Sequence, residues 1–516
     1  MRVKDIISDP CGLFSLLIPM TLSCRNAEVF EVKSPNVIYI LADDLGYAEL
    51  GCYGQEKIET PNIDALAING MRFIQHYTGS PVCAPARCIL LTGRHSGHAQ
   101  IRGNDEMAER GDVWNFAAVS GDPNLEGQRP FKQGTQTIGT LFQEAGYKTA
   151  AIGKWGLGGP VTEGVPNKQG FDFFFGYNCQ RQAHTYFPLH LWKNTEKVSL
   201  SNKTVFPHTS LSEGANPYDP GSYADFRLTD YAPELMQNEL IHFIKENKDS
   251  CFFLYYASPI PHVPLQAPKQ WVDYYVKKFG DEEPYTGEQG YFPNRYPHAC
   301  YAAMVSYLDE QVGEIVATLK ELNIYENTLI IFSSDNGPTF NGGSDSPWFN
   351  SAKPFQSEQG WGKASVMEGG IRIPMIVQWP CRIESGTVSD LLSAHYDVLS
   401  TLCELTGIET IGETDGISFL PTLFGEEQKE KHEFLYWEYP AAGGQQAVRL
   451  GKWKGIRKNT FRGDLHVQLY NLEEDIREMN DVSEQYPEIV NKIELIFKQE
   501  HRSSCIERFK IYQLEK

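Results

Sequence analysis

The sequence predicts an α/β protein with a large mixed, mostly parallel sheet sandwiched by helices, followed by a small C-terminal subdomain built on an antiparallel sheet. Two patterns lead to this prediction. Over most of the chain, short apolar strands alternate with segments of helical periodicity. Beyond about residue 410 the character changes, and alternating apolar and polar residues with glycine-containing turns take over. The 516 residues accommodate one large domain and one small one.

The individual elements follow from local patterns. Residues 36–42 read Asn-Val-Ile-Tyr-Ile-Leu-Ala, which predicts a buried strand. Thr137 is suited to cap a helix that Gly146 ends, because the apolar residues between them fall on one helical face. We expect further strands at 149–152, 251–257, 328–332 and 373–379, helices at 235–246 and 304–319, antiparallel strands within 437–457, and a closing helix at 488–498.

The first residues have the pattern of an export signal. Arg2 and Lys4 precede an apolar stretch at 12–22, which has the length of a signal peptide. Cys24 follows a small residue, as in bacterial lipoproteins, and would then carry a lipid. The alternative is a mispredicted start codon. We expect an exported protein, in the periplasm or at the cell surface, whose only membrane contact is such an anchor. The expected segments are a signal at 1–24, a catalytic domain at 30–425 and the C-terminal subdomain at 426–516.

Composition excludes several classes of protein. Lys and Arg number 46 and Asp and Glu 66, so the formal charge is −20, which argues against a nucleic-acid binder. Eleven cysteines are too few for a disulfide scaffold of this length, and no Cys-x-x-Cys pair indicates zinc. Residues 102–133 and 195–230 lack periodicity, which predicts long loops of the kind that often carry function. The oligomeric state stays open.

Polar residues of chemical interest follow the carboxyl ends of four predicted strands. The carboxyl ends of parallel strands meet at one edge of a sheet, and ligands bind at that edge in open α/β proteins, so we expect one shared site. The residues are Asp43, Asp44, Lys154, His262, Asp335 and Asn336.

One segment is more specific than the others. Cys83-Ala-Pro85-Ala-Arg87 is followed by Leu-Thr-Gly-Arg94. It resembles the signature of the type I sulfatases of the alkaline-phosphatase superfamily, in which the cysteine is oxidised to formylglycine after translation. The resemblance implies that a formylglycine-generating enzyme modifies Cys83 and that Arg87 is catalytic. Outside this context, Cys83 would be taken for a buried thiol.

The two acidic motifs resemble the metal motifs of the same family. Asp43 and Asp44 match the first motif, and Asp335 and Asn336 match the second. Four oxygen-bearing side chains suit Ca²⁺, with Mg²⁺ the less favoured ion. The resemblance implies that the modified Cys83 completes this metal shell.

Three further residues match the family's sulfate-handling positions. Lys154 lies in a Gly-Lys-Trp segment, and Lys363 opens another segment similar to a family motif. His262 stands in a Pro-His-Val-Pro turn. The resemblance implies that both lysines bind sulfate oxygens, and that His262 assists the leaving oxygen or hydrogen-bonds to it.

Gly156 departs from the family pattern. The family has a histidine at this position, which is thought to help release sulfate. We expect His184 to take over that role, with binding of a sugar hydroxyl as the alternative. Arg102, in a polar stretch near the signature, is expected to bind substrate.

The expected function is hydrolysis of sulfate esters, with a sulfated sugar or oligosaccharide as substrate. Polar and aromatic residues near the motifs suit a sugar, and the net charge of −20 favours short oligosaccharides or chain ends over highly sulfated polymers. The first alternative is a phosphoester hydrolase of the alkaline-phosphatase superfamily. The second is a non-catalytic glycan-binding protein, which would be expected to have degraded motifs.

Overall fold

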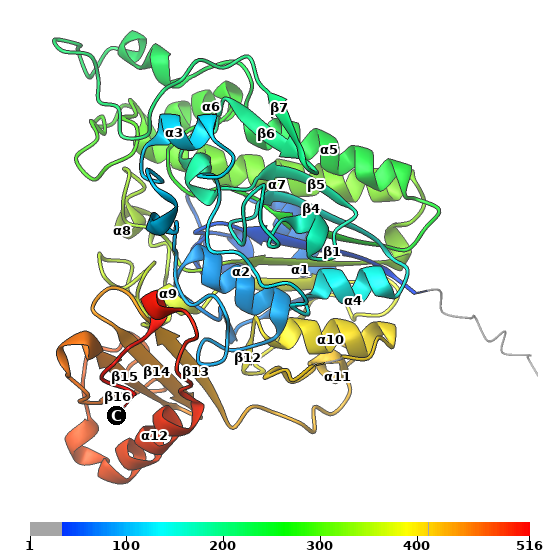
Figure 1. The fold of residues 1–516 in the computed structure, drawn as a ribbon, viewed down its shortest axis with the longest axis vertical. Coiled ribbons are helices and arrows are strands. Elements are labelled where there is room, and N and C mark those ends of the chain that lie inside the picture. Colours follow the sequence, from blue (N-terminus) through cyan, green and yellow to red (C-terminus); the bar gives the residue numbers. More distant parts are fainter. Residues whose placement is uncertain (1–33, 411, 516) are drawn as a thin grey trace, which may run out of the picture. The chain divides into compact units, whose positions relative to one another are not determined.

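A ten-stranded mixed sheet forms the centre of the computed structural model, which describes residues 34–410 and 412–515 (Figure 1). The predicted signal segment and Cys24 lie outside the described residues. Five mutually parallel strands occupy the middle, and antiparallel pairings bring in the strands on both sides. In spatial order the strands are β11 (Thr387–Ser389), β2 (Met71–Phe73), β10 (Met375–Gln378), β9 (Thr328–Ser334), β1 (Asn36–Ala42), β8 (Phe252–Ala257), β4 (Lys148–Lys154), β5 (Phe173–Tyr177), β6 (His190–Lys193) and β7 (Glu196–Ser199).

Helices cover both faces of this sheet (Figure 1). One face packs against α2 (Cys83–Thr92), α4 (Ile138–Glu144) and α10 (Asp397–Thr406). The other packs against α1 (Pro61–Ile68), α5 (Ala232–Glu246), α6 (Lys269–Phe279) and α7 (Pro297–Glu321).

Strand β1 shows why residues 37–42 are apolar. Val37, Tyr39 and Leu41 point into one core, and Ile38 and Ile40 point into the other. A strand buried on both faces needs apolar side chains at every position, because successive side chains alternate between the faces. The predicted fold class is therefore confirmed.

Helix α4 has the predicted caps. The Thr137 hydroxyl accepts the backbone N–H of Thr140 at 3.1 Å, and the Thr140 hydroxyl accepts the N–H of Thr137 at 2.9 Å. This reciprocal pair satisfies two donors that the first helical turn leaves free. Gly146 follows the helix with φ of 86°, a left-handed conformation that favours glycine.

A separate four-stranded antiparallel sheet lies near the C-terminus (Figure 1). Its strands are β13 (Phe434–Tyr439), β14 (Gln445–Leu450), β15 (Trp453–Lys458) and β16 (Gln468–Asn471). Helix α12 (Pro487–Glu500) packs on it through Ile493 and Phe497. Trp437 of β13 packs into a hydrophobic core that also contains side chains of the large sheet, so the two sheets share this core. Residues 34 onward form one compact unit.

The predicted long loops contain short elements that periodicity does not reveal. Helix α3 (Phe116–Gly121) lies within residues 102–133, and β7 lies within 195–230. The remaining short elements are β3 (His76–Tyr77), β12 (Ser393–Ala394), α8 (Ser346–Phe349), α9 (Glu368–Ile371) and α11 (Leu420–Leu423). Within the described part of the chain, no helix combines the length and apolarity that a bilayer crossing requires.

Candidate active site

The carboxyl ends of the central parallel strands converge on one site, as the sequence predicted. Strand β1 leads into Asp43, β4 ends at Lys154, β8 leads toward His262, and β9 leads into Asp335. The first residue of α2, Cys83, reaches the same place from outside the sheet, because its Sγ lies 3.4 Å from Asp43 Oδ1.

The acidic residues are buried and linked to one another. The backbone N–H of Asp44 donates to Asp335 Oδ1 at 3.0 Å, and Asn336 Nδ2 donates to Asp44 Oδ1 at 2.8 Å. Asp44 has φ of 66°, an uncommon conformation for a residue other than glycine. Such backbone strain is concentrated at functional sites, where the surroundings hold it in place.

Three carboxyl groups share a small volume with basic side chains. Burial, together with the charges of Asp43 and Asp44, raises the pKa of Asp335 well above its ordinary value. Burial also opposes ionisation of Asp43, but Lys154 and its other basic neighbours outweigh that effect and hold its pKa below the ordinary value. The opposite directions show that the carboxyl groups compete for a limited amount of positive charge.

The donor set fits a hard divalent cation. Asn336 Oδ1 is buried and has no hydrogen-bond partner among the described residues. Asp43, Asp44 and Cys83 place potential ligand atoms within 4.8 Å of one another, with His262 beside them. An unpartnered amide oxygen next to crowded carboxylates is the environment that Ca²⁺ satisfies with oxygen ligands. The residues predicted to bind metal therefore lie together.

Both predicted sulfate-binding lysines reach this centre. Lys154 Nζ forms an ion pair with Asp43 and lies 3.8 Å from Cys83 Sγ. Lys363 Nζ lies 2.7 Å from Asp44. Burial, with the charge of Asp43, raises the pKa of the Cys83 thiol to about 12. The thiol is therefore protonated at neutral pH and is a weak nucleophile as it stands.

Arg87 lies one helical turn after Cys83, on the same face of α2. Its guanidinium is only 1 % exposed and is held at three points. Nε donates to Trp155 O at 2.9 Å, Nη1 lies 3.3 Å from Asp335 Oδ2, and Nη2 donates to Gln180 Oε1 at 2.7 Å. The sequence pattern did not single out Gln180, although it lies four residues before His184.

His262 faces the acidic residues as well. Its Nδ1 is hydrogen-bonded to Val263 O, which assigns the proton to Nδ1, and its Nε2 lies 3.7 Å from Asp44 Oδ2. Burial and the charges of Lys154 and Lys363 hold the pKa of His262 well below its ordinary value. The imidazole is therefore neutral at physiological pH in this arrangement.

His184 and Tyr291 form the wall beside His262. The His184 ring stacks on the His262 ring at 5.4 Å between centroids, and the Tyr291 ring meets the His184 ring edge-on at 5.1 Å. Tyr291 has φ of 65°, and its N–H donates to Nδ1 of His208 at 2.8 Å. His208 belongs to the predicted loop 195–230. Nothing in the sequence pattern singled out Tyr291.

The structure corrects the expectation for Arg102. Its side chain is buried, and its guanidinium is used internally, by Glu438 at 3.0 Å, by Gly97 O at 2.6 Å and by Ala99 O at 3.0 Å. These contacts connect the loop after α2 to strand β13. Arg102 therefore ties the loop after α2 to the C-terminal sheet, and these contacts occupy its guanidinium.

A second group of ligand-type side chains, His95, His98 and Glu500, is explained by hydrogen bonds. Nδ1 of His95 accepts the N–H of Gly97 at 3.1 Å, so its Nε2 carries the proton and donates to Glu500 at 3.0 Å. A metal on that nitrogen would require it to be unprotonated. His98 Nδ1 bonds to Asp415 at 2.9 Å. The group connects the end of α2 to the end of α12.

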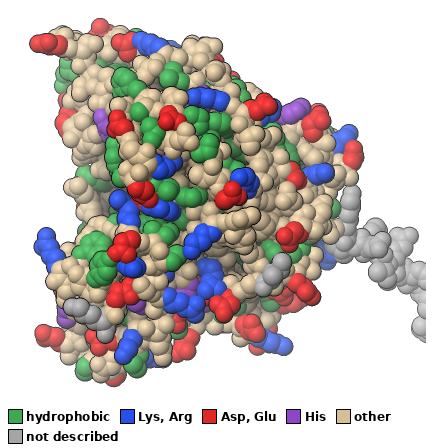
Figure 2. All heavy atoms as spheres, in the orientation of Figure 1, with side chains coloured by type: hydrophobic (Ala, Val, Ile, Leu, Met, Phe, Trp, Pro, Cys, Tyr) green, Lys and Arg blue, Asp and Glu red, His purple; other side chains and the backbone are tan. Residues whose placement is uncertain are grey.

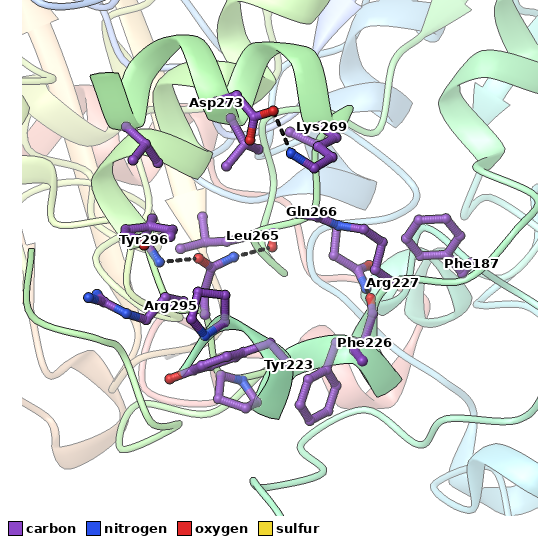
Figure 3. Close-up of a pocket in the computed structure, with 17 residues that line it drawn as sticks. Phe187, Tyr223, Phe226, Arg227, Leu265, Gln266, Lys269, Asp273, Arg295 and Tyr296 are labelled. Atoms are coloured by element: carbon purple, nitrogen blue, oxygen red, sulfur yellow. Dashed lines mark hydrogen bonds and ion pairs between the residues drawn. The ribbon is translucent and has the colours of Figure 1, made fainter. Parts of the chain in front are cut away.

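A cavity of about 360 Å³ lies between α6, the 3₁₀ helix Pro220–Phe226 and residues 293–296 (Figure 3). Several of its polar side chains are already paired, as Arg295 Nη1 donates to Glu282 O at 2.7 Å and Asn294 Nδ2 donates to Leu265 O at 2.8 Å. Its lining includes no residue of the predicted site, so we do not place substrate there.

Comparisons with known proteins agree with this geometry. A family model described as Sulfatase matches residues 35–408, and one described as N-sulphoglucosamine sulphohydrolase, C-terminal, matches residues 357–503. The chain is 31 % identical to N-acetylgalactosamine-6-sulfatase of Canis lupus familiaris over 82 % of this chain and 71 % of that protein. It is 28 % identical to N-acetylgalactosamine-6-O-sulfatase of Bacteroides thetaiotaomicron, covering 89 % and 92 %.

A solved structure titled Ps i-CgsB in complex with k-i-k-neocarrahexaose superimposes with a TM-score of 0.70 at 27 % identity, covering 91 % of this chain and 94 % of that one. The chain belongs to the sulfatase family, within the alkaline-phosphatase superfamily. It is an enzyme of the type I sulfatase class, a sulfuric ester hydrolase.

Proposed function

We propose that the enzyme removes sulfate from sulfated sugars, using a formylglycine formed from Cys83 and a Ca²⁺ ion bound by Asp43, Asp44, Asp335 and Asn336. One observation carries the proposal. Cys83 heads the sulfatase signature, and its Sγ lies beside the Asp43–Lys154 ion pair, 3.4 Å from Asp43 Oδ1 and 3.8 Å from Lys154 Nζ. That position suits a nucleophile that must face both a metal ion and an anionic substrate.

The sugar substrate is supported by the names of relatives. Two relatives are named for N-acetylgalactosamine 6-sulfate, and the superimposed structure holds a neocarrahexaose. The wall of His184, His262 and Tyr291 suits a sugar as well, because rings and polar edges together can bind its apolar faces and its hydroxyls.

Bound at this site, Ca²⁺ would supply Lewis-acid polarisation, and formylglycine would supply a hydrated aldehyde with a hydroxyl nucleophile. The chain's own residues hold the sulfate. Lys154 and Lys363 offset charge on its oxygens, and the two guanidinium N–H groups that Arg87 has left over can do the same. These groups are already in place, so little reorganisation is needed when charge develops.

His262 acts at the leaving oxygen. Its Nδ1 is engaged with Val263 O, so its Nε2 is the nitrogen available to substrate. A sulfate between Lys154 and Lys363 would offset the two charges that lower the pKa of His262. Protonation at Nε2 would then let His262 donate a hydrogen bond or a proton to the departing sugar oxygen.

His184 contacts the sugar on the same side. Its ring stacks on His262, whereas the space beside Gly156 is filled by Gln180. We therefore replace the expected sulfate-releasing role of His184 with contact to the leaving sugar.

We also propose that the enzyme is exported to the periplasm or the cell surface, with a lipid on Cys24 if that residue is processed.

A side-by-side assay of sulfate and phosphate monoesters tests the function. We expect turnover of sulfated mono- and oligosaccharides in a linkage-resolved panel, with phosphate esters at least about a hundredfold slower, because the four proposed side-chain ligands Asp43, Asp44, Asp335 and Asn336 are hard oxygen donors rather than zinc-type ligands. Cys83→Ala is the matched control and should have no activity with either ester. Phosphate turnover that exceeds sulfate turnover would favour the phosphoester hydrolase. A protein that binds sugars without hydrolysing them would favour the glycan-binding alternative.

A further inference from the structure

Gly156 and Gln180 occupy one small space next to Arg87. A Cβ added to Gly156 would lie 2.8 Å from Arg87 Nη2 and 2.9 Å from Gln180 Oε1, closer than real Cβ contacts allow. Gly156 also has φ of 68°, a conformation that favours glycine. The missing side chain at position 156 is therefore what permits the Arg87–Gln180 hydrogen bond.

Both residues are fixed by their neighbours. The N–H of Gly156 donates to Asn178 O at 3.1 Å, which continues the pairing of β4 with β5 beyond the strand ends. The backbone N–H of Gln180 donates to Gln128 Oε1 at 2.8 Å, and the Gln180 side chain is buried. Gln180 therefore reaches Arg87 from a defined position rather than from a free loop.

The contact completes the restraint on Arg87. Trp155 O and Asp335 hold two of the guanidinium nitrogens, and Gln180 Oε1 holds the third at 2.7 Å. A guanidinium held at all three nitrogens cannot rotate about its last bonds. Its two remaining N–H groups then have fixed directions before any anion arrives, and such preorganisation strengthens anion binding.

We propose that Gln180 is the positioning residue that replaces the side chain absent at Gly156: it orients Arg87 toward the bound sulfate, and Gly156 and Gln180 act as a matched pair. This inference rests on the proposed function. An amide is not a base at neutral pH, so Gln180 supplies Arg87 with a hydrogen-bond acceptor but cannot take a proton as a histidine at position 156 could.

The test measures binding rather than turnover. In a Cys83→Ala background with calcium present, isothermal titration with inorganic sulfate gives an affinity that does not depend on formylglycine. We expect Gln180→Ala to weaken sulfate binding about tenfold, because Arg87 loses one of its three restraints. Gly156→Ala should weaken it to a similar extent. The double variant should be no weaker than the worse single variant, because both changes remove the same contact.

Gln182→Ala is the control. Gln182 is buried on the same 3₁₀ helix, Gln180–His184, and its Nε2 contacts His190 at 3.4 Å. Gln182→Ala should lower the melting temperature, because it removes a buried polar side chain, and it should leave the affinity for sulfate unchanged. A Gln180→Ala protein that binds sulfate within twofold of its parent, or additive effects in the double variant, would overturn the inference. If the Cys83→Ala parent binds no sulfate, the proposed function fails first and this inference falls with it.

Discussion

Asp43 experiences two opposing effects. Burial disfavours its charge, while Lys154 and the other basic neighbours favour it, and the net effect lowers its pKa. Asp335 lacks that surplus of positive charge, and its pKa is raised. The difference arises within one cluster, since the N–H of Asp44 donates to Asp335 and Asp44 pairs with Lys363. A further positive charge would relieve this competition.

Calcium removal tests whether a bound cation relieves the competition among these carboxyl groups. Chelation should abolish activity and lower the melting temperature, because an ion that binds only the folded state stabilises it by mass action. Calcium should restore both properties better than zinc, since the donors are hard oxygens. Asp335→Asn should weaken calcium binding by at least tenfold in titration calorimetry. Rescue by zinc alone would contradict the oxygen-ligand assignment.

Arg102 ties the loop after α2 to β13 through its ion pair with Glu438. Arg102→Lys keeps the charge next to Glu438 but cannot reach Gly97 O and Ala99 O at once. We expect a lower melting temperature and an unchanged KM for a sulfated sugar. Arg502→Lys is the control and should alter neither, because the Arg502 side chain is 58 % exposed and its ion pair with Glu413 is long, at 3.9 Å. A tenfold rise in KM without a change in melting temperature would return Arg102 to the substrate site.

His298, near the start of α7, makes stability depend on pH. Burial lowers its pKa, but hydrogen bonds to Asp345 and Glu282 outweigh this and raise it to about 9. A raised pKa means that the folded state binds a proton more tightly than the unfolded state. The stabilisation is therefore full below about pH 6.5 and is lost as pH rises toward about 9. Melting temperatures between pH 6 and 10 should fall less steeply for His298→Gln. An identical pH profile would contradict the assignment.

Sequence patterns located the elements that are long and buried. The predicted strand at 36–42 coincides with β1, and the cap at Thr137 coincides with the start of α4. They did not reveal β6 and β7, because short strands at the sheet edge are fixed by pairing with a neighbour rather than by their own periodicity. Element ends also shifted, as α7 begins at Pro297, before the apolar face becomes regular.

The residues of the candidate site likewise divide into those that the sequence predicted and those that it did not. Asp43, Lys154 and Asp335 were predictable because strand ends in a parallel sheet share an edge. Gln180 and Tyr291 were not, since their roles depend on how loops from distant parts of the chain meet. Gln180 rests on Gln128, and Tyr291 rests on the His208 loop.

The charge of the whole molecule bears on substrate size. The net charge is −20, and Figure 2 shows acidic and basic side chains interspersed over the visible face rather than gathered into one basic surface. Such a surface gives a long sulfated polymer little attraction outside the pocket. We expect the enzyme to release sulfate from chain ends and from short oligosaccharides. Chromatography of the reaction products measures this preference. Internal desulfation of polymers at rates equal to those of oligosaccharides would contradict this expectation.

In the function that we propose, Cys83 becomes the nucleophile by losing its thiol. Burial raises the pKa of the unmodified thiol to about 12, so the cysteine itself is unsuited to attack at neutral pH. The most direct measurement is peptide mass spectrometry of residue 83, with an aldehyde-reactive probe, on protein matured in a host that has the formylglycine-generating enzyme. Our expectation is an aldehyde at position 83 in a fraction that scales with specific activity across preparations. A fully active preparation in which Cys83 is an intact thiol would contradict it.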